Sequence, residues 1–194
     1  MFVNVDWFFF SHRAIIAENA QKYGIEMSVF TEFTNPYHGK NAPYRLFNSP
    51  LKRVSIFKIS LIKQFWQAFS LIKDSKPDLL HAVTIKPIIV IGLIARITKT
   101  PFVAAISGLG PAFSQQRLQS KIYRYVLTKT FKIIMSTDKA RVICQNLSDK
   151  KILIELGVIE ENKIFIIPGS GVNLNRFRPN RNRNEKKKIV FTNC

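Results

Sequence analysis

The sequence predicts an α/β fold, a parallel sheet of the Rossmann type with helices on both faces. Short apolar runs that suit buried strands recur along the chain, near residues 2, 26, 79, 102, 143 and 165. Segments with the apolar spacing of amphipathic helices separate most of these runs, and strands that alternate with helices are typical of a parallel sheet. With 194 residues, the chain is long enough for one sizeable domain and too short for two full ones.

The amino-terminal part is expected to begin with a strand at residues 2–5. Residues 6–13 (DWFFFSHR) then place four consecutive aromatic side chains where a strand passes into a helix, and we expect this segment to be a loop. Ser11 is a candidate cap for the following helix, because a short hydroxyl side chain accepts from free backbone N–H groups. That helix is expected to end at Gly24, and a second strand at residues 25–30 follows it.

The middle of the chain combines a long loop with a strongly amphipathic helix. Residues 35–53 contain three prolines and predict a loop with one short strand near residues 45–47. Residues 55–73 predict a helix whose apolar stripe we expect to lie in the core. The members of this stripe are Ile59, Ile62, Phe65, Trp66, Phe69 and Ile72.

The second half of the chain continues the alternation of strands and helices. A strand near residue 79 precedes a helix with Pro87 in its first turn, and residues 101–106 predict the next strand. A long basic helix is expected at residues 115–135. The series ends with a strand at residues 142–144, a helix capped by Asn146 or Ser148 and ended by Gly157, and a strand at residues 164–167.

The chain is strongly basic, with 30 Lys and Arg against 12 Asp and Glu and a net charge of +18. Such an excess indicates a polyanionic partner, which is nucleic acid, anionic lipid or a phosphorylated substrate. Residues 33–73 carry seven basic residues and no acid, and the expected helix at 115–135 also lacks acids. Arg117, Lys121, Arg124 and Lys132 fall on one side of that helix, and Leu118, Ile122, Tyr125, Val126 and Ile133 supply an apolar face. The helix either covers the sheet with its cations solvated, or also rests on an anionic surface.

Residues that could take part in binding or catalysis occur in three segments that follow expected strands, at 6–13, 81–87 and 107–111. These segments converge on one edge of a parallel sheet, the edge at which open α/β sheets bind ligands. The candidate residues are Asp6, His12, Arg13, His81, Thr84, Lys86, Ser107, Gly108 and Gly110. Cations and helix N-termini bind phosphate groups, and small residues let a ligand approach the backbone. Structural alternatives remain open: His81 can be a packing residue, Asp6 a helix cap, and the Gly-x-Gly pair an ordinary turn, since it lacks the third glycine of a dinucleotide site.

Several classes of site are not expected. Cys144 and Cys194 give neither a disulfide framework nor the spacing of a metal site, and a reducing compartment fits them. No basic segment followed by an apolar one opens the chain, so no secretory signal is expected. The longest apolar run, residues 87–95, is far short of the roughly 20 residues needed to span a bilayer, so we expect any membrane contact to be peripheral.

The stretch from residue 142 to residue 179 resembles the end of the N-terminal domain of a family 4 glycosyltransferase with the GT-B architecture. The resemblance rests on the order strand, helix, strand, PGSGVN (168–173) and RFRP (176–179). The segments NVDWFFFSHR (4–13), HAVTIKP (81–87) and SGLG (107–110) resemble a bacterial subgroup of that family that acts on undecaprenyl-diphosphate-linked glycans. The chain departs from the family pattern at Asn173, where aspartate is commoner, and at Val83 and Ser107, where many members have histidine.

The resemblance implies a retaining hexosyltransferase whose donor is a nucleotide sugar, with a UDP-sugar expected from the family. It also implies that no metal or other cofactor is used. The acceptor is then a lipid-linked glycan in capsule, O-antigen or glycoprotein glycan assembly, on the cytoplasmic side of the plasma membrane. From their positions after the expected strands, His81 and Asp6 are the candidate catalytic residues and the seven other candidates are expected to bind substrate. The charge pattern of the basic helix places Arg117, Lys121 and Arg124 at the membrane or the acceptor diphosphate.

The resemblance to family 4 glycosyltransferases also implies a division of the chain into two parts. Residues 1–178 are expected to form the N-terminal acceptor-side domain, and residues 179–194 a linker and the first strand of a C-terminal donor domain. This chain alone is then expected to be inactive. Two alternatives remain: a non-catalytic subunit of a two-chain glycosyltransferase, and a nucleic-acid-binding module, for which no recognition motif is visible.

Overall fold

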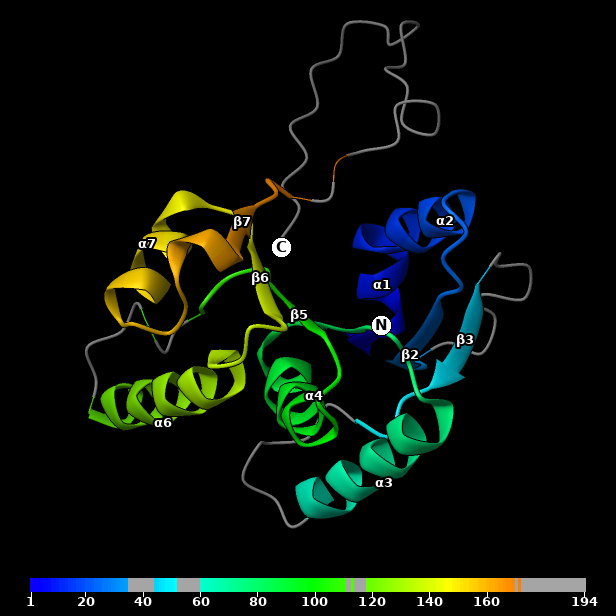
Figure 1. The fold of residues 1–194 in the computed structure, drawn as a ribbon, viewed down its shortest axis with the longest axis horizontal. Coiled ribbons are helices and arrows are strands. Elements are labelled where there is room, and N and C mark those ends of the chain that lie inside the picture. Colours follow the sequence, from blue (N-terminus) through cyan, green and yellow to red (C-terminus); the bar gives the residue numbers. More distant parts are fainter. Residues whose placement is uncertain (35–43, 52–59, 111–112, 114–117, 170, 172–194) are drawn as a thin grey trace, which may run out of the picture.

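The computed structural model describes residues 1–34, 44–51, 60–110, 113, 118–169 and 171. A parallel sheet of seven strands in the order β3-β2-β1-β4-β5-β6-β7 runs through the middle of the molecule (Figure 1). The strands are β1 (Phe2–Val5), β2 (Ser28–Glu32), β3 (Arg45–Asn48), β4 (Leu80–Val83), β5 (Phe102–Ile106), β6 (Ala140–Cys144) and β7 (Ile164–Ile166). The six strands predicted between residues 2 and 167 are present, and the short strand expected near residue 45 is β3.

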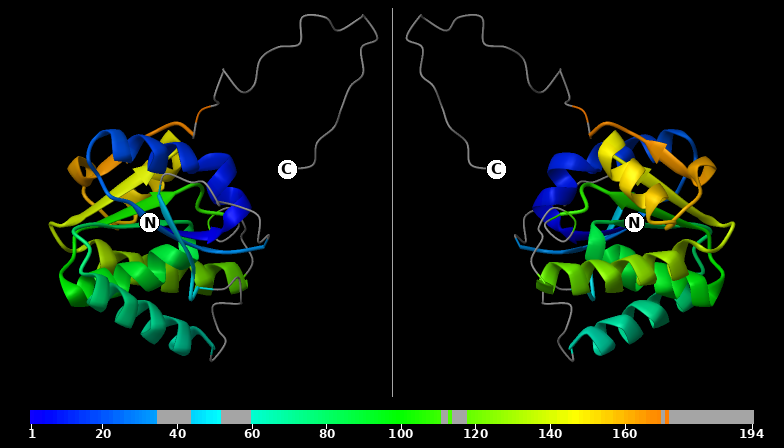
Figure 2. Two further views of the ribbon diagram at one scale, coloured as in Figure 1. Left: turned by 90° about the vertical axis from the view of Figure 1, so that its right-hand side faces the viewer. Right: turned by 90° about the vertical axis from the view of Figure 1, so that its left-hand side faces the viewer.

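Helices cover both faces of the sheet (Figures 1 and 2). They are α1 (Asp6–His12), α2 (Ala14–Lys22), α3 (Ser60–Ser75), α4 (Ile85–Thr98), α6 (Leu118–Met135) and α7 (Leu147–Glu155), with a 3-10 turn at Glu161–Lys163. The buried side chains of α3, α4, α6 and α7 share one core cluster, whereas those of α1 and α2 belong to a second cluster on the other face. These layers confirm the predicted Rossmann-like α/β fold.

The chain changes direction across the sheet between β1 and β4. From β1 the chain continues through α1 and α2 to β2 on one side, and from β4 it continues through α4 to β5 on the other. Ligands of open α/β sheets bind at the carboxyl ends of the strands that flank such a switch point. At this point Thr84, between β4 and α4, adopts φ 72° and ψ 159°, a backbone region restricted almost entirely to glycine.

The expectation that residues 6–13 form a loop is wrong. Residues Asp6–His12 form helix α1, and the chain breaks at Arg13 before α2 begins. Ser11 does not cap a helix, because its hydroxyl donates to the carbonyl of Trp7 at 2.6 Å inside α1. Phe9 is completely buried in the second core cluster, and this burial holds the aromatic segment on the sheet as a helix.

The apolar stripe expected in the core of α3 is only partly there. Ile72 is buried, but Ile62 and Trp66 have 64% and 61% of their surface exposed. The fully buried positions follow a neighbouring stripe, Gln64, Ala68 and Ile72, which are spaced four residues apart. The predicted amino-terminal turn of this helix, including Ile59, lies outside the described residues.

The apolar face proposed for α6 does not cover the sheet either. Leu127, Phe131, Ile134 and Met135 make the contact with the core. Ile122, Tyr125, Val126 and Ile133, which the sequence placed on the apolar face, are instead 48% to 63% exposed. Helix α6 therefore has two apolar stripes, and one of them faces outward.

The signals at the ends of α7 are confirmed. The side-chain oxygen of Asn146 accepts from the backbone N–H of Asp149 at 2.8 Å, as an N-cap does. Gly157 follows the helix with φ +61°, the left-handed conformation expected of it. The RFRP segment and the expected linker and strand at residues 179–194 lie outside the described residues.

Gly92 sets the close approach of α4 to α6 and to β5. A Cβ atom at this position would lie 2.6 Å from Cγ2 of Ile134 and 3.1 Å from Cε1 of Phe102. Overpacking of this kind costs about 1–3 kcal/mol, whereas alanine in place of glycine within a helix contributes about 1 kcal/mol. We expect Gly92→Ala to lower the free energy of unfolding, by about 1 kcal/mol net, in urea titrations monitored by circular dichroism.

The matched control is Ile134→Leu, which removes the Cγ2 methyl group that a new Cβ would meet. In the Ile134→Leu background, Gly92→Ala should cost less than in the original chain. Stabilisation of the original chain by Gly92→Ala would show that helix propensity outweighs the contact.

Candidate functional site

Arg13 joins three segments of the chain on the face of the sheet that α1 and α2 cover. It lies almost buried between these two helices. With the Gln145 amide oriented to satisfy both neighbours, its oxygen accepts from Nη2 of Arg13 at 3.0 Å and its nitrogen donates to the carbonyl of Ser107 at 3.3 Å. Burial lowers the pKa of the Arg13 guanidinium, because desolvation penalises its charge. The carboxyl ends of β5 and β6 are thereby linked to the start of α2.

His81 lies on the same face. The sequence suggested a loop position for it, but it lies within a strand. It is the second residue of β4, and its neighbours Leu80 and Ala82 point into the opposite core cluster. Burial, followed by the positive charges of the Met1 amino group and Arg13, lowers the pKa of His81 to about 3. The imidazole is therefore neutral at pH 7, and its Nε2 has no hydrogen-bond partner among the described residues.

Asp6 has no exposed surface and ties the beginning of α1 to the end of β2. One carboxylate oxygen accepts from the N–H of Trp7 at 2.8 Å and from the hydroxyl of Thr34 at 2.6 Å. The other accepts from the N–H of Thr34 at 2.9 Å. These contacts hold the two strand ends together, and a catalytic role for Asp6 stays a prediction.

Lys86 is separated from Arg13 and His81 by the sheet. It is the second residue of α4, largely buried, and its Nζ donates to the side-chain oxygen of Gln64 on α3 at 3.1 Å. Burial lowers the pKa of Lys86, and the nearby carboxylate of Glu32 opposes this shift. The hydroxyl of Thr84, at the beginning of α4, has no hydrogen-bond partner among the described residues.

The segment from Ser107 to Gly110 leaves its backbone accessible. A Cβ atom built at Gly108 or Gly110 would meet nothing within 4 Å, and Gly110 has φ +69°. Leu109 between them is buried and anchors the segment in the core. A ligand can therefore approach this backbone closely, at the carboxyl end of β5.

His12 lies on the exposed side of α1 and stays apart from the buried cluster. Its ring stacks on Phe8, with 4.7 Å between ring centroids, and its Nδ1 lies 2.5 Å from the hydroxyl of Ser11. The structure thus brings Arg13, Ser107 and His81 to one face, and it places Asp6, Lys86 and His12 around them.

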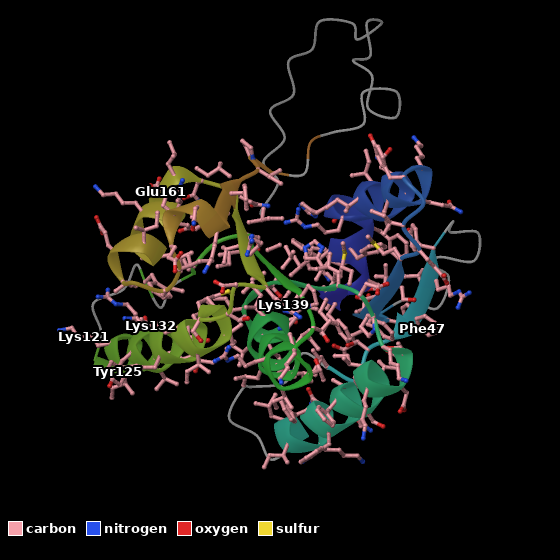
Figure 3. The ribbon with its side chains drawn as sticks, viewed as in Figure 1. Phe47, Lys121, Tyr125, Lys132, Lys139 and Glu161 are labelled. Atoms are coloured by element: carbon pink, nitrogen blue, oxygen red, sulfur yellow. The ribbon has the colours of Figure 1, made fainter. Side chains whose placement is uncertain are left out.

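The outer side of α6 combines cations with apolar side chains, and we call it the α6 outer face. Lys121, Arg124 and Lys129 are exposed, and the ammonium group of Lys129 lies 5.5 Å from the centroid of the Tyr125 ring. In Figure 3, Lys121 and Tyr125 project outward from the end of the helix, away from the sheet. The helix carries no acidic residue. The third cation predicted with Lys121 and Arg124, Arg117, lies outside the described residues.

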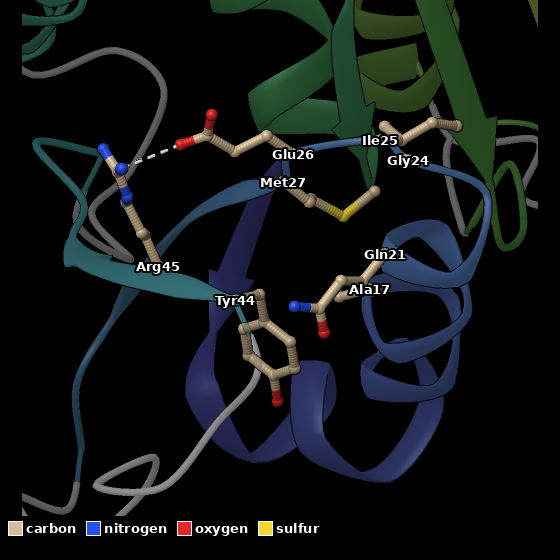
Figure 4. A pocket seen from close by; sticks show the side chains of 8 residues that line it. All are labelled: Ala17, Gln21, Gly24, Ile25, Glu26, Met27, Tyr44 and Arg45. Atoms are coloured by element: carbon tan, nitrogen blue, oxygen red, sulfur yellow. Dashed lines mark ion pairs between the residues drawn. The ribbon is translucent and has the colours of Figure 1, made fainter.

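A hollow of about 550 Å³ opens elsewhere, at the amino ends of β2 and β3 (Figure 4). The ion pair between Arg45 and Glu26, at 3.0 Å, closes one side of it. The hydroxyl of Tyr44 lies in this region, and burial together with Glu18 raises its pKa to about 12. Because the hollow lies at the opposite edge from Arg13 and Ser107, we do not assign it to the site.

Sequence reasoning missed three partners of the candidate residues: Thr34, Gln64 and Gln145. Gln145 follows β6 directly, so the strand-end argument that selected Ser107 applies to it equally. Thr34 and Gln64 give no signal in the sequence, because only the fold brings them to Asp6 and Lys86.

Among the described residues, no three His, Cys, Asp or Glu side chains gather as metal ligands would. No helix in that part of the chain has the length and apolar character needed to cross a bilayer.

Comparison with known proteins gives one family and two curated relatives. Residues 1–137 match the family described as Glycosyl transferase 4-like. Over 142 residues the chain is 27% identical to an N,N'-diacetylbacillosaminyl-diphospho-undecaprenol alpha-1,3-N-acetylgalactosaminyltransferase of Campylobacter jejuni. The matched region covers 73% of this chain and 37% of that protein. Over 148 residues it is 26% identical to a UDP-Gal:alpha-D-GlcNAc-diphosphoundecaprenol alpha-1,3-galactosyltransferase of Escherichia coli, covering 76% and 37%. The matched region spans about 37% of the length of both relatives.

Proposed function

Because the chain belongs to the glycosyl transferase 4-like family, we propose that it forms the acceptor-binding part of an enzyme that transfers a hexose to an undecaprenyl-diphosphate-linked sugar. The observation that carries the proposal is the shared wording of the two relatives, whose names both specify a diphospho-undecaprenol-linked sugar. The E. coli name also specifies UDP-Gal, which supports a UDP-sugar donor. Retention of the anomeric configuration is part of the proposal and rests on the family resemblance.

The residues near the switch point suit an acceptor that carries a diphosphate. Arg13 supplies positive charge, the open backbone of residues 107–110 supplies N–H donors, and the amino-terminal end of α4 supplies a favourable dipole. In the proposed reaction the bond between the anomeric carbon of the donor and UDP breaks with its electrons on UDP, a hydroxyl of the acceptor sugar bonds to the same face of that carbon, and the hydroxyl proton passes to the departing diphosphate. The groups that face a diphosphate here lower the charge repulsion between the two substrates without a metal ion. His81 is neutral at pH 7 and its Nε2 has no hydrogen-bond partner among the described residues, which supports a role as a hydrogen-bonding group beside Arg13.

The proposal is tested with the 194-residue chain and a short-chain prenyl-diphospho-N-acetylglucosamine. We expect saturable binding of this compound, measured by isothermal titration calorimetry, and no sugar transfer by the chain alone when UDP-sugars are added. The second expectation follows from the 37% share, because most of the length of each relative lies outside the matched region. Failure to bind the sugar diphosphate would refute the acceptor assignment. Turnover by the chain alone would refute the division into acceptor and donor parts, and with it the reading as a non-catalytic subunit.

We also propose that the enzyme works at an anionic membrane surface, with the α6 outer face toward the lipid. The acceptor class is lipid-linked, so the enzyme must meet it at a bilayer. The α6 outer face presents cations for lipid headgroups and exposed Ile122, Tyr125 and Val126 for the boundary between headgroups and acyl chains. Each basic residue near an anionic surface contributes about 1 kcal/mol to binding.

Reversing two charges on this face should remove most of the membrane binding. We expect the double variant Lys121→Glu, Arg124→Glu to bind vesicles containing phosphatidylglycerol at least about tenfold more weakly, because two attractions become repulsions. Cosedimentation measures the effect, and binding of the unaltered chain should fade as salt rises, since charges are screened within about 8 Å at physiological ionic strength.

The matched control is the double variant Lys22→Glu, Lys151→Glu, which makes the same charge change on exposed positions of α2 and α7. It should keep its binding if the α6 outer face, rather than net charge, makes the contact. Equal binding of the unaltered chain to neutral phosphatidylcholine vesicles, or equal weakening by both double variants, would contradict the assignment.

A further inference from the structure

Helix α1 presents a second mixed surface, which we call the α1 outer face: Trp7, Phe8, Ser11 and His12. These positions follow the spacing i, i+1, i+4 and i+5, so they lie on one side of the helix. Trp7 is 50% exposed, and its ring meets that of Phe8 edge-on with an interplanar angle of 86°. Phe8 in turn stacks on His12 at 16°. Three planar side chains, an indole, a phenyl ring and an imidazole, thus contact one another in this order.

The other side of α1 is anchored, which fixes the direction of this face. Asp6 is bonded to Thr34, Phe9 is buried in the core, and Arg13 is held by Gln145. The helix begins directly after β1, one of the two strands that flank the switch point. The α1 outer face is therefore a rigid surface beside the place where ligands of this fold bind.

The polar members of the face are arranged to receive a hydroxyl group. The Ser11 hydroxyl donates to the carbonyl of Trp7, so its oxygen accepts from Nδ1–H of His12. In the neutral ring this leaves Nε2 as the acceptor, and Nε2 has no hydrogen bond to any described residue. A surface with aromatic rings and one hydrogen-bond acceptor suits a ligand that has an apolar face and hydroxyl groups at its edge.

We propose that the α1 outer face binds the sugar ring of the acceptor, an N-acetylated hexose 1-diphosphate, by stacking on Trp7 and by a hydroxyl hydrogen bond to His12. The inference deepens the proposed function and rests on it. A pyranose ring has a C–H face that packs on an aromatic ring and hydroxyls that point outward, and this matches the face described. A prenyl chain offers no hydroxyl for His12. Because Trp7 is exposed, this face also offers a prenyl chain no enclosed apolar channel.

The sequence contains two tryptophans, Trp7 and Trp66, which makes fluorescence a direct test. In the Trp66→Phe variant, Trp7 is the only reporter. We expect its emission to change on titration with geranyl-diphospho-N-acetylglucosamine and to stay unchanged with geranyl diphosphate, which lacks the sugar. Calorimetry with the same compound should show about tenfold weaker binding for Trp7→Ala, the effect expected from loss of one stacked ring. Trp7→Phe should remain within about threefold of the unaltered chain, because a ring is kept.

Trp7→Leu separates stacking from simple apolar contact, because it keeps apolar area without a ring, and it should behave like Trp7→Ala. Unchanged circular dichroism melting of the variants shows that the fold is retained. Equal binding by Trp7→Ala and the unaltered chain would overturn the inference and leave the proposed function standing. An emission change with geranyl diphosphate alone would assign the face to the lipid, and a response to UDP but not to the acceptor would assign it to the donor base. Absence of any binding by the unaltered chain would instead refute the acceptor assignment itself.

Discussion

Replacing Asp6 by alanine is expected to lower the free energy of unfolding by about 3 kcal/mol or more. The carboxylate is fully buried and accepts hydrogen bonds from the N–H of Trp7 and from the N–H and hydroxyl of Thr34. Hydrogen bonds to a charged group contribute about 1.5–3 kcal/mol each, and buried donors left without a partner add a further cost. Urea titration measured by circular dichroism gives the change directly.

Two variants separate this structural role from a catalytic one. Asp6→Asn keeps one accepting oxygen and should cost less than Asp6→Ala, and Thr34→Val removes the hydroxyl donor alone and should cost about 1–2 kcal/mol. If Asp6→Ala keeps its stability but loses sugar transfer in the assembled enzyme, the anchoring explanation is wrong and the predicted catalytic role gains support. Loss of stability in the order alanine, asparagine, Thr34→Val would support anchoring.

The sheet was predictable because its signals are local. Each strand is a short apolar run bounded by turn residues, and the alternation with helices requires parallel pairing. The cap at Asn146 and the left-handed Gly157 were also readable, since each depends on its immediate neighbours. The same holds for the position of Gln145, which the strand-end argument would have found.

The errors arose where two apolar stripes compete on one helix. In α6, periodicity identifies an apolar face but does not say that Leu127 and Phe131, rather than Ile122 and Tyr125, turn toward the sheet. In α1, the local preference of Ser11 for a helix start was overridden by the burial of Phe9, a tertiary effect. The outward stripes that remained are the ones we connect with function.

The candidate site was predicted as a single group and is divided by the sheet. Arg13 and Ser107 meet through Gln145 on one face, whereas Lys86 reaches Gln64 on the other. The division follows from the direction in which each chain segment leaves its strand, α1 toward one face and α4 toward the other, which sequence spacing does not reveal. His81 was misplaced for a simpler reason: β4 continues through it to Val83.

His81 should make the fold sensitive to acid. Its pKa is lowered to about 3 in the folded protein, mainly by burial, against an ordinary value of 6.5. Between these two values the unfolded chain binds a proton that the folded chain does not, so a fall in pH favours unfolding. The stability that the neutral imidazole contributes is therefore fully present above pH 6.5 and is lost progressively as the pH falls from 6.5 toward 3.

The expected loss approaches about 1.4 kcal/mol for each pH unit within that window, since one proton is involved. Urea titrations at intervals between pH 7 and pH 4.5 measure the slope. His81→Leu removes the titrating group and keeps an apolar side chain in the buried position, so its stability should fall less steeply over the same range. An equal slope in the variant and the original chain would show that other groups govern the acid response. A shallower slope together with retained binding of the prenyl-diphospho-sugar would show that the imidazole stabilises the acid-sensitive face without contacting the acceptor.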